Sequence, residues 1–378
     1  MVVRYERRKY KTILNKYRFI DSWFWCRYSV NPYSGCEFAC TYCDSRSHRY
    51  HLHPDFDQVI YVKEEVGRML DLRLSRARTL LPDVVAIGGS GDAYQPAELE
   101  FQNTRRCLEV LLRHHYPVFI STKSELVRRD ADLLGSIARD SHCTLTATIT
   151  TFDDDLVRLV EPGASPPVDR LGALEEVKGR RPEVQTGVNL IPVIPYLTDD
   201  EGNLQEVVSR SRKAGVDFIL FGSGMTMRDD QARWFLTRLG ESFPELLPRY
   251  LDLYEASFDP VGGYQGNYGA KSGYLNRIDK MILQLCEESG LPFRARRFIP
   301  GDFRRTNYLI SEIFLNEAYE ARIRGGRWKN LHWAGMNIGN LRESLEDIAE
   351  REELRGIRNV DEGLEGRILE LIERFKVS

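Results

Sequence analysis

Short apolar runs alternate with longer amphipathic segments between about residue 25 and residue 225. The short runs are bounded by Gly, Pro and polar residues, as β-strands are, and the amphipathic segments indicate helices. The six expected strands are "WFWCRYSV", "VVAIGG", "PVFIST", "CTLTATIT", "VQTGVNLIPV" and "FILFGSG". The main helices expected between them are "NTRRCLEVLLRHH", "RDADLLGSIARD", "RLGALEEVKGR" and "NLQEVVSRSRKAG".

The repeated order of strand and helix predicts an α/β fold with a parallel sheet and helical crossovers. The strands are continuously apolar, which is typical of strands covered on both faces. Both an open doubly wound sheet and a closed or partly closed barrel fit this pattern. In either architecture ligands bind at the carboxyl ends of the strands. The polar and glycine-rich segments fall just past those ends, and they therefore predict a single site: "NPYSGC", "GGSGDAYQP", "STKS", "TITTFDDD" and "GSGM".

The pattern changes after about residue 240. The segment "SFDPVGGYQGNYGAKSGY" is rich in Gly and Tyr and predicts a loop that could serve as a lid. Helices follow it, separated by the basic segment "FRARRFIPGDFRR". We therefore expect a basic N-terminal arm over residues 1–24, an α/β domain over 25–240, and a loop with a mostly helical extension over 241–378.

Composition adds little to this picture except at the N-terminus. The chain has 378 residues and a formal net charge of −3, so no overall positive field favours nucleic acid. The first eighteen residues are nonetheless strongly basic. No secretory signal is visible, and no apolar stretch is long enough to span a bilayer. Seven cysteines without the spacing of a disulfide framework favour a reducing cytoplasm.

Three of the cysteines, Cys36, Cys40 and Cys43, lie within eight residues in "CEFACTYC". Thiolates at this spacing can bind one metal centre. A structural zinc site requires four ligands, and a [4Fe-4S] cluster usually has four cysteines. Three cysteines leave one iron of such a cluster open for chemistry. One histidine of "HRYHLH" could instead complete a Cys3His zinc site.

The loop resembles the CxxxCxxC motif of radical S-adenosylmethionine (SAM) enzymes, with Tyr42 just before the last cysteine. The resemblance implies a partial (β/α)6 TIM-type barrel. It also implies a [4Fe-4S] cluster on Cys36, Cys40 and Cys43 and S-adenosyl-L-methionine on the open iron. In that family the reduced cluster cleaves the cofactor to a 5′-deoxyadenosyl radical, which abstracts hydrogen from a substrate. An external electron donor of the flavodoxin or ferredoxin type is then expected.

A narrower resemblance, to the spore photoproduct lyase-like branch, covers six blocks from Lys11 to Asn203: "KTILNK", "NPYSGCEFACTYCDSR", "GDAYQPAE", "STKSELVRRDADLL", "TITTFDDDLVRLVEPGASPPVDRL" and "VNLIPVIPYLTDDEGN". It implies that Tyr42 lies near the adenine and that Lys123 faces the carboxylate of the cofactor. Ser90 and Asp92 would contact its amino group, and Thr148 its ribose or methionine portion.

The sequence departs from this branch at one position that matters. The lyase has a cysteine just upstream of its Ser-Asp pair, where this chain has Gly88 and Gly89. Repair of spore photoproduct is therefore not expected, and the substrate stays unidentified. Nucleic acid stays open, because the basic arm and Arg294, Arg296, Arg297, Arg304 and Arg305 could contact phosphates. The alternatives are a non-catalytic nucleic-acid-binding protein with a zinc or cluster site, and a redox sensor that keeps the cluster.

Overall fold

A computed structural model describes residues 3–89 and 91–376. The chain forms two compact units. The first comprises Met1–Asn15, Ser29–Leu81 and Val85–Ala295, and the second comprises Lys16–Tyr28, Pro82–Val84 and Arg296–Ser378. The expected division into residues 1–24, 25–240 and 241–378 stays a prediction.

The main sheet has seven strands in the order β10-β9-β8-β7-β6-β3-β2, and its core pairs from β6 to β10 are parallel. Its strands are β2 (Leu14–Lys16), β3 (Tyr28–Val30), β6 (Val85–Ile87), β7 (Val118–Thr122), β8 (Cys143–Thr148), β9 (Gln185–Val193) and β10 (Phe218–Ser223). All six expected strands are present, although the first keeps only its last three residues. The predicted fold class, a partial TIM-type barrel with a helical extension, is confirmed.

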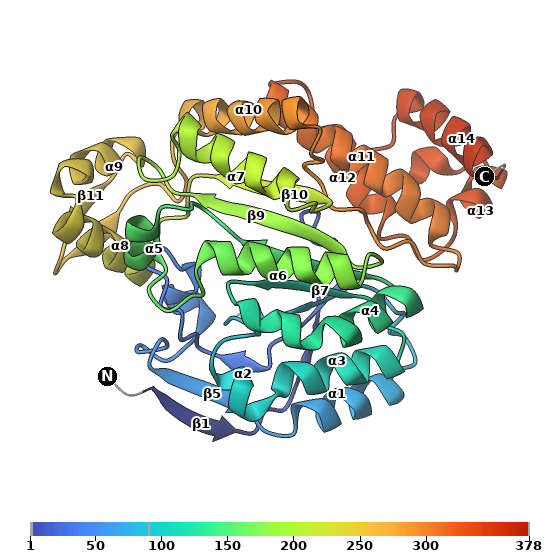
Figure 1. The fold of residues 1–378 in the computed structure, drawn as a ribbon. Helices are drawn as coiled ribbons and strands as arrows, with labels where there is room; N and C mark the ends of the chain where they lie inside the picture. Colours follow the sequence, from blue (N-terminus) through green and yellow to red (C-terminus); the bar gives the residue numbers. More distant parts are fainter. Residues whose placement is uncertain (1–2, 90, 377–378) are drawn as a thin grey trace. The chain divides into compact units, whose positions relative to one another are not determined.

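Helices connect successive strands and cover one side of this sheet (Figure 1). They are α1 (Val66–Ser75), α2 (Ala97–Phe101), α3 (Asn103–Arg113), α4 (Ala131–Asp140), α5 (Asp154–Val160), α6 (Pro167–Arg180) and α7 (Glu201–Lys213). Short 3₁₀ helices lie at η1 (Asp44–Arg46), η2 (His48–Tyr50) and η3 (Glu125–Asp130). Each helix buries an apolar face, as α3 does with Cys107, Leu108 and Leu111. The strands therefore end at a common edge, which the loops cover.

Part of the basic N-terminal arm forms a strand, which the sequence pattern did not predict. β1 (Arg4–Arg8) pairs in parallel with β5 (Val59–Lys63), and β4 (Tyr33–Ser34) pairs with the other side of β5. The charged side chains of β1 are largely exposed, and Arg8 stacks on the ring of Tyr61 at 3.4 Å. Charged residues are common on edge strands because they prevent pairing with other chains.

The segment after residue 256, expected to be a loop, contains a short hairpin, which corrects that expectation. β11 (Ser257–Asp259) and β12 (Gly263–Gln265) pair antiparallel. Before it lie α8 (Asp229–Ser242), η4 (Pro244–Leu246) and α9 (Leu247–Leu253), and after it α10 (Ser272–Ser289) packs on α7 and β10.

The second unit is helical, as predicted. Its elements are α11 (Arg305–Arg324), α12 (Lys329–Ile338), α13 (Leu345–Glu350), η5 (Leu354–Gly356) and α14 (Glu362–Lys376). Apolar residues of these helices, including Phe314, Leu345 and Ile368, form its core. Among the described residues, none of the helices combines the length and apolar character that a membrane span requires.

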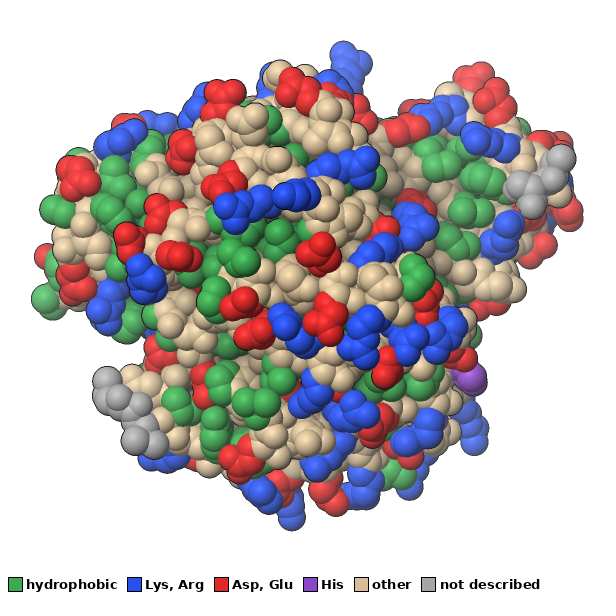
Figure 2. Space-filling model, in the orientation of Figure 1, with side chains coloured by type: hydrophobic (Ala, Val, Ile, Leu, Met, Phe, Trp, Pro, Cys, Tyr) green, Lys and Arg blue, Asp and Glu red, His purple; other side chains and the backbone are tan. Residues whose placement is uncertain are grey.

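The basic segment near residue 300 is only partly a surface feature. Arg297 and Arg304 are 5% and 6% exposed. The guanidinium of Arg297 lies 3.6 Å from the ring centre of Tyr308, and Arg304 pairs with Asp302 at 2.7 Å. These two arginines therefore do not offer free charges to phosphates. Elsewhere, Lys and Arg alternate with Asp and Glu over the face shown in Figure 2. Arg139, for example, pairs with Glu183, and Arg180 pairs with Glu176.

Candidate active site

A cavity of about 440 Å³ opens at the carboxyl ends of the parallel strands. Its walls come from the cysteine loop, from the last residues of β7, β8 and β9, and from the segments that follow β6, β7 and β10. Seven of the eight residues predicted for the site line it: Cys36, Cys40, Tyr42, Cys43, Asp92, Lys123 and Thr148. The eighth, Ser90, lies outside the described residues. Predicted residues up to 112 positions apart in the chain thus share one cavity (positions 36 and 148).

The cysteine loop runs between β4 and η1, and backbone hydrogen bonds hold it in place. The N–H of Cys36 donates to Phe56 at 2.9 Å, and the N–H of Cys43 donates to Cys40 at 3.3 Å. The sulfur of Cys36 accepts a hydrogen bond from the backbone N–H of Asp92 at 3.4 Å. Burial raises the pKa of Cys40 to about 12. Buried thiolates therefore need a cation, and a bound metal centre would supply it.

Glycines bring neighbouring loops against the cysteine loop. Gly35 has a φ of +99°, which L side chains rarely adopt. A Cβ added to Gly91 would lie 2.2 Å from the carbonyl oxygen of Gly35, and one added to Gly163 would lie 2.3 Å from that of Glu37. The loop is therefore enclosed by backbone on two sides.

This close approach predicts a difference between two glycines of the same loop. Gly91→Ala is expected to destabilise the fold by about 1–3 kcal/mol, because backbone atoms must move to admit the methyl group. Gly89→Ala is the matched control, since its Cβ would meet only the Oδ1 of Asn31 at 3.4 Å. Chemical denaturation of both variants measures the difference, and equal free energies of unfolding would contradict it.

The carboxylate of Asp92 is fully engaged within the protein. Oδ1 accepts from the hydroxyl of Thr122 at 2.6 Å and from the N–H of Tyr94 at 2.9 Å, while Oδ2 accepts from the N–H of Lys123 at 2.8 Å. Burial raises the pKa of Asp92, and the hydrogen bonds oppose this shift. The side chain thus fixes the start of the loop after β7, from which Lys123 extends into the cavity.

Lys123 lies above the ring of Tyr42, with Nζ 5.5 Å from its centre. Burial alone would lower the pKa of Lys123, but the neighbouring Cys40 and Glu161 outweigh it and the pKa is raised. The cavity therefore presents a partly buried cation beside the cysteines, which suits an anionic group of a ligand.

A chain of buried, hydrogen-bonded polar groups holds the hydroxyl of Tyr42 in place. Its hydroxyl donates to Oε1 of Glu161, and Oε2 of Glu161 lies 2.6 Å from Nη1 of Arg170. Arg170 and Glu161 are each 1% exposed. Nη1 of Arg170 also donates to the carbonyl of Thr148 at 2.8 Å, and its Nε donates to that of Ser165 at 2.6 Å. This chain joins the cysteine loop to the end of β8.

Three residues that matter here were not predicted from the sequence: Gln95, Glu161 and Arg170. Glu161 stands in the block "EPGASPP", and Gln95 stands in "GDAYQPAE". Both blocks belong to the six that resemble the lyase-like branch, and that resemblance was the sequence feature that pointed to them. No spacing of residues, however, marks these side chains as buried.

The histidines of "HRYHLH" do not line the cavity of the cysteines. His48, His51 and His53 line a second cavity of about 740 Å³, bounded by η1, η2 and α8, and Ser45 borders both cavities. Nδ1 of His48 lies 3.3 Å from Asp229. Among the described residues, no three His, Cys, Asp or Glu side chains are placed to hold a single metal ion.

The two glycines after β6 differ in the space around them. Gly88 has a φ of +90°, and a Cβ there would lie 2.9 Å from the N of Ala93. Gly89 donates its N–H to Asn31 at 2.6 Å and has room for a side chain. Both border the cavity without contributing a thiol.

The sequence model of the Radical SAM superfamily matches residues 30–208, the stretch that carries the three cysteines and the strands around the cavity. The chain belongs to the radical SAM superfamily. The predictions of a radical SAM enzyme and of its two cofactors, a [4Fe-4S] cluster and SAM, are thereby confirmed at the level of the superfamily.

Relatives of this radical SAM protein occur in bacteria and archaea. An uncharacterized protein of Mycobacterium bovis is 32% identical over 232 residues, covering 60% of this chain and 67% of the relative. One of Methanocaldococcus jannaschii is 28% identical over 176 residues, covering 46% of this chain and 63% of the relative.

Solved structures of spore photoproduct lyase resemble this radical SAM protein in fold. One mutant of that lyase has a TM-score of 0.57 at 15% identity, covering 75% of this chain and 79% of the lyase. The lyase complexed with dinucleoside spore photoproduct has a TM-score of 0.56 at 14% identity, with the same coverage. The fold implied by the narrower resemblance is thus confirmed.

Proposed function

We propose that this chain is a radical SAM enzyme that cleaves SAM reductively and abstracts hydrogen from a substrate still to be identified. Cys36, Cys40 and Cys43 would hold a [4Fe-4S] cluster, and the cavity of about 440 Å³ would hold SAM. The observation that carries the proposal is the meeting of three cysteines and a partly buried lysine in one cavity at the ends of the parallel strands.

The donor set fits the cluster. The remaining cysteines, Cys26, Cys107, Cys143 and Cys286, are buried elsewhere and do not border the cavity. Three thiolates therefore leave one iron without a cysteine. When bound and reduced, the cluster supplies the electron that cleaves the sulfonium of SAM to a 5′-deoxyadenosyl radical.

The residues of the chain would bind and orient SAM. Lys123 offers a cation for the carboxylate of the methionine portion. Ser90 and Asp92 would contact its amino group beside the backbone of the turn from Gly88, and Asp92 would also hold the start of the loop that carries Lys123. Tyr42 would border the adenine, and Thr148 the ribose or the methionine portion.

The substrate would differ from that of the lyase whose fold the chain shares. No thiol stands at Gly88 or Gly89, so the reaction would end by another route than hydrogen return from a cysteine there. The second cavity, of about 740 Å³, meets the first at Ser45, and we propose that it admits substrate. Residues 25–240 would then generate the radical, and the loop and helices of residues 241–378 would adapt the enzyme to its substrate.

An external reductant would deliver the electron, and a flavodoxin or ferredoxin has the required chemistry. A reducing cytoplasm suits a cluster that oxygen destroys. The alternative, a non-catalytic zinc protein, lacks support from the histidines, which border the other cavity.

The test is anaerobic reconstitution of the full chain with iron and sulfide. We expect about four irons per chain, a broad absorbance in the visible range, and 5′-deoxyadenosine after addition of SAM and dithionite. A colourless protein with one zinc would favour the alternative, and a cluster that yields no 5′-deoxyadenosine would favour a redox sensor.

A further inference from the structure

The side chain of Gln95 bridges the cysteine loop and the glycine-rich loop after β6. It is 0% exposed. Its Nε2 donates to the carbonyl of Gly35 at 3.0 Å and to that of Asp92 at 3.1 Å, while its Oε1 accepts from the N–H of Glu37 at 3.1 Å. One amide therefore bonds to the backbone on both sides of Cys36.

Gln95 also holds the donor of the hydrogen bond to Cys36. The N–H of Asp92 donates to the sulfur of Cys36 at 3.4 Å, and Gln95 bonds to the carbonyl of the same Asp92. We propose that Gln95 is a positioning residue that fixes the sulfur of Cys36 against this N–H and thereby sets the reduction potential of the cluster. This inference rests on the proposed function, since it concerns a cluster held by Cys36.

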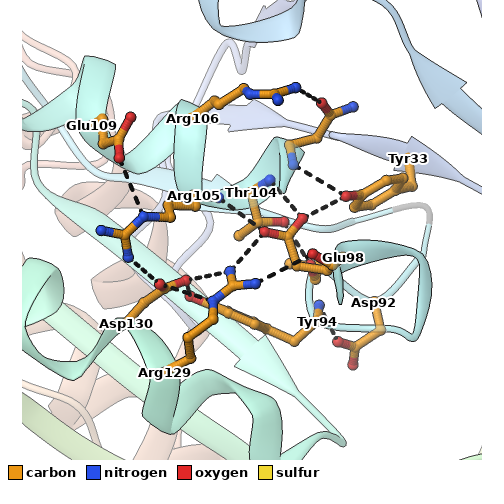
Figure 3. A network of polar contacts seen from close by, with 12 residues as sticks. Tyr33, Asp92, Tyr94, Glu98, Thr104, Arg105, Arg106, Glu109, Arg129 and Asp130 are labelled. Atoms are coloured by element: carbon orange, nitrogen blue, oxygen red, sulfur yellow. Dashed lines mark hydrogen bonds and ion pairs between the residues drawn. The ribbon is translucent and has the colours of Figure 1, made fainter. Parts of the chain in front are cut away.

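A polar network holds the turn that carries Gln95 (Figure 3). The hydroxyl of Tyr94 donates to Asp130 at 3.1 Å, and Glu98 pairs with Arg129 at 2.8 Å. Glu98 also accepts from the hydroxyl of Tyr33 at 2.5 Å, and Tyr33 precedes Gly35 by two residues. The residues before and after Gln95 are thus anchored, so its amide is held in place before any cofactor binds.

The position requires an amide. Leucine would leave two carbonyls and one N–H without their partner, each buried at a cost of about 1–3 kcal/mol. Glutamate has the same shape but, when ionised, would direct its oxygens at the carbonyls of Gly35 and Asp92. A glutamate at this position would keep only the acceptor for the backbone N–H of Glu37.

Loss of this support should change the cluster itself. Hydrogen bonds to ligand sulfurs help to set the potential of iron–sulfur clusters. An N–H dipole stabilises the more negative, reduced state, so weakening it makes the potential more negative. Changes in the groups that orient metal ligands typically cost about 10–100-fold in affinity or activity.

The experiment compares full-length chains reconstituted anaerobically: the unmodified protein, Gln95→Leu, Gln95→Glu and the control Gln185→Leu. Gln185 is 1% exposed, and its Oε1 accepts from Thr144 at 3.1 Å at the start of β9, so the control also removes a buried amide. Iron content, a redox titration followed by electron paramagnetic resonance, and the rate of 5′-deoxyadenosine formation are measured.

We expect both Gln95 variants to show a more negative midpoint potential, an altered resonance spectrum, and a rate about 10–100-fold lower. Failure of both to load iron, with Gln185→Leu loaded, would also support the proposal, because it shows that the cysteine loop depends on Gln95. An unchanged potential and spectrum in Gln95→Leu, or equal changes in Gln185→Leu, would overturn it. If the unmodified protein itself loads no iron, the proposed function fails instead.

Discussion

Cys40→Ala is expected to abolish reductive cleavage of SAM. Cys40 is 7% exposed, and it is the middle one of the three proposed ligands. Its loss leaves two thiolates, which cannot hold a cluster with a single open iron. We expect loss of the visible absorbance and of most of the iron, and formation of 5′-deoxyadenosine should fall to the background of the assay. Iron analysis and chromatography of the nucleoside products provide the measurement.

Cys107→Ala is the matched control. Cys107 is 0% exposed and lies in α3, where it does not border the cavity. Its replacement removes a small buried group and should lower only the free energy of unfolding. Cleavage that persists in Cys40→Ala, or that disappears equally in Cys107→Ala, would refute the role assigned to the loop.

Arg170→Leu is expected to destabilise the protein by about 3–5 kcal/mol. Arg170 is the partner of the buried carboxylate of Glu161, at 2.6 Å. Its removal leaves that carboxylate without its ion-pair partner and the carbonyls of Ser165 and Thr148 without the donor that Arg170 supplies. The loss should appear in denaturant unfolding followed by circular dichroism. Tyr42, whose hydroxyl bonds to Glu161, should also become more accessible to solvent.

Arg180→Leu on the same helix provides the comparison. Arg180 pairs with Glu176 at 3.1 Å, but the side chains are 47% and 40% exposed. Exposed pairs of this kind contribute about 0–1 kcal/mol. If the two arginine variants unfold at the same denaturant concentration, the buried pair does not have the stabilising role that its geometry indicates.

The sheet was predictable because its strands are covered on both faces. Continuous apolar runs such as "PVFIST" and "CTLTATIT" have few alternatives to a buried strand. The strand β1 was not predicted, because its charged residues indicated an exposed arm. The segment becomes part of a sheet only through its pairing with β5. The hairpin β11–β12 was not predicted either, because its glycines suit both an open loop and the turn of a hairpin.

The residues of the site also differ in whether the sequence alone reveals them. The three cysteines are marked by their spacing alone, and Lys123 and Asp92 by their places after strands. Gln95, Glu161 and Arg170 are ordinary polar residues in the sequence, and their importance arises from partners far along the chain. Tyr42 and Glu161, for example, are separated by 119 positions. Such contacts exist only once the fold has formed, so no local pattern reports them.

The bonds that shape the cysteine loop are all made within the protein. Gln95 bonds to it on one side, and Glu161 receives the hydroxyl of Tyr42 on the other. Small zinc domains, by contrast, fold only when their metal binds. We therefore expect the cysteine loop of this chain to take its shape before iron binds, so that cluster insertion would be a step separate from folding.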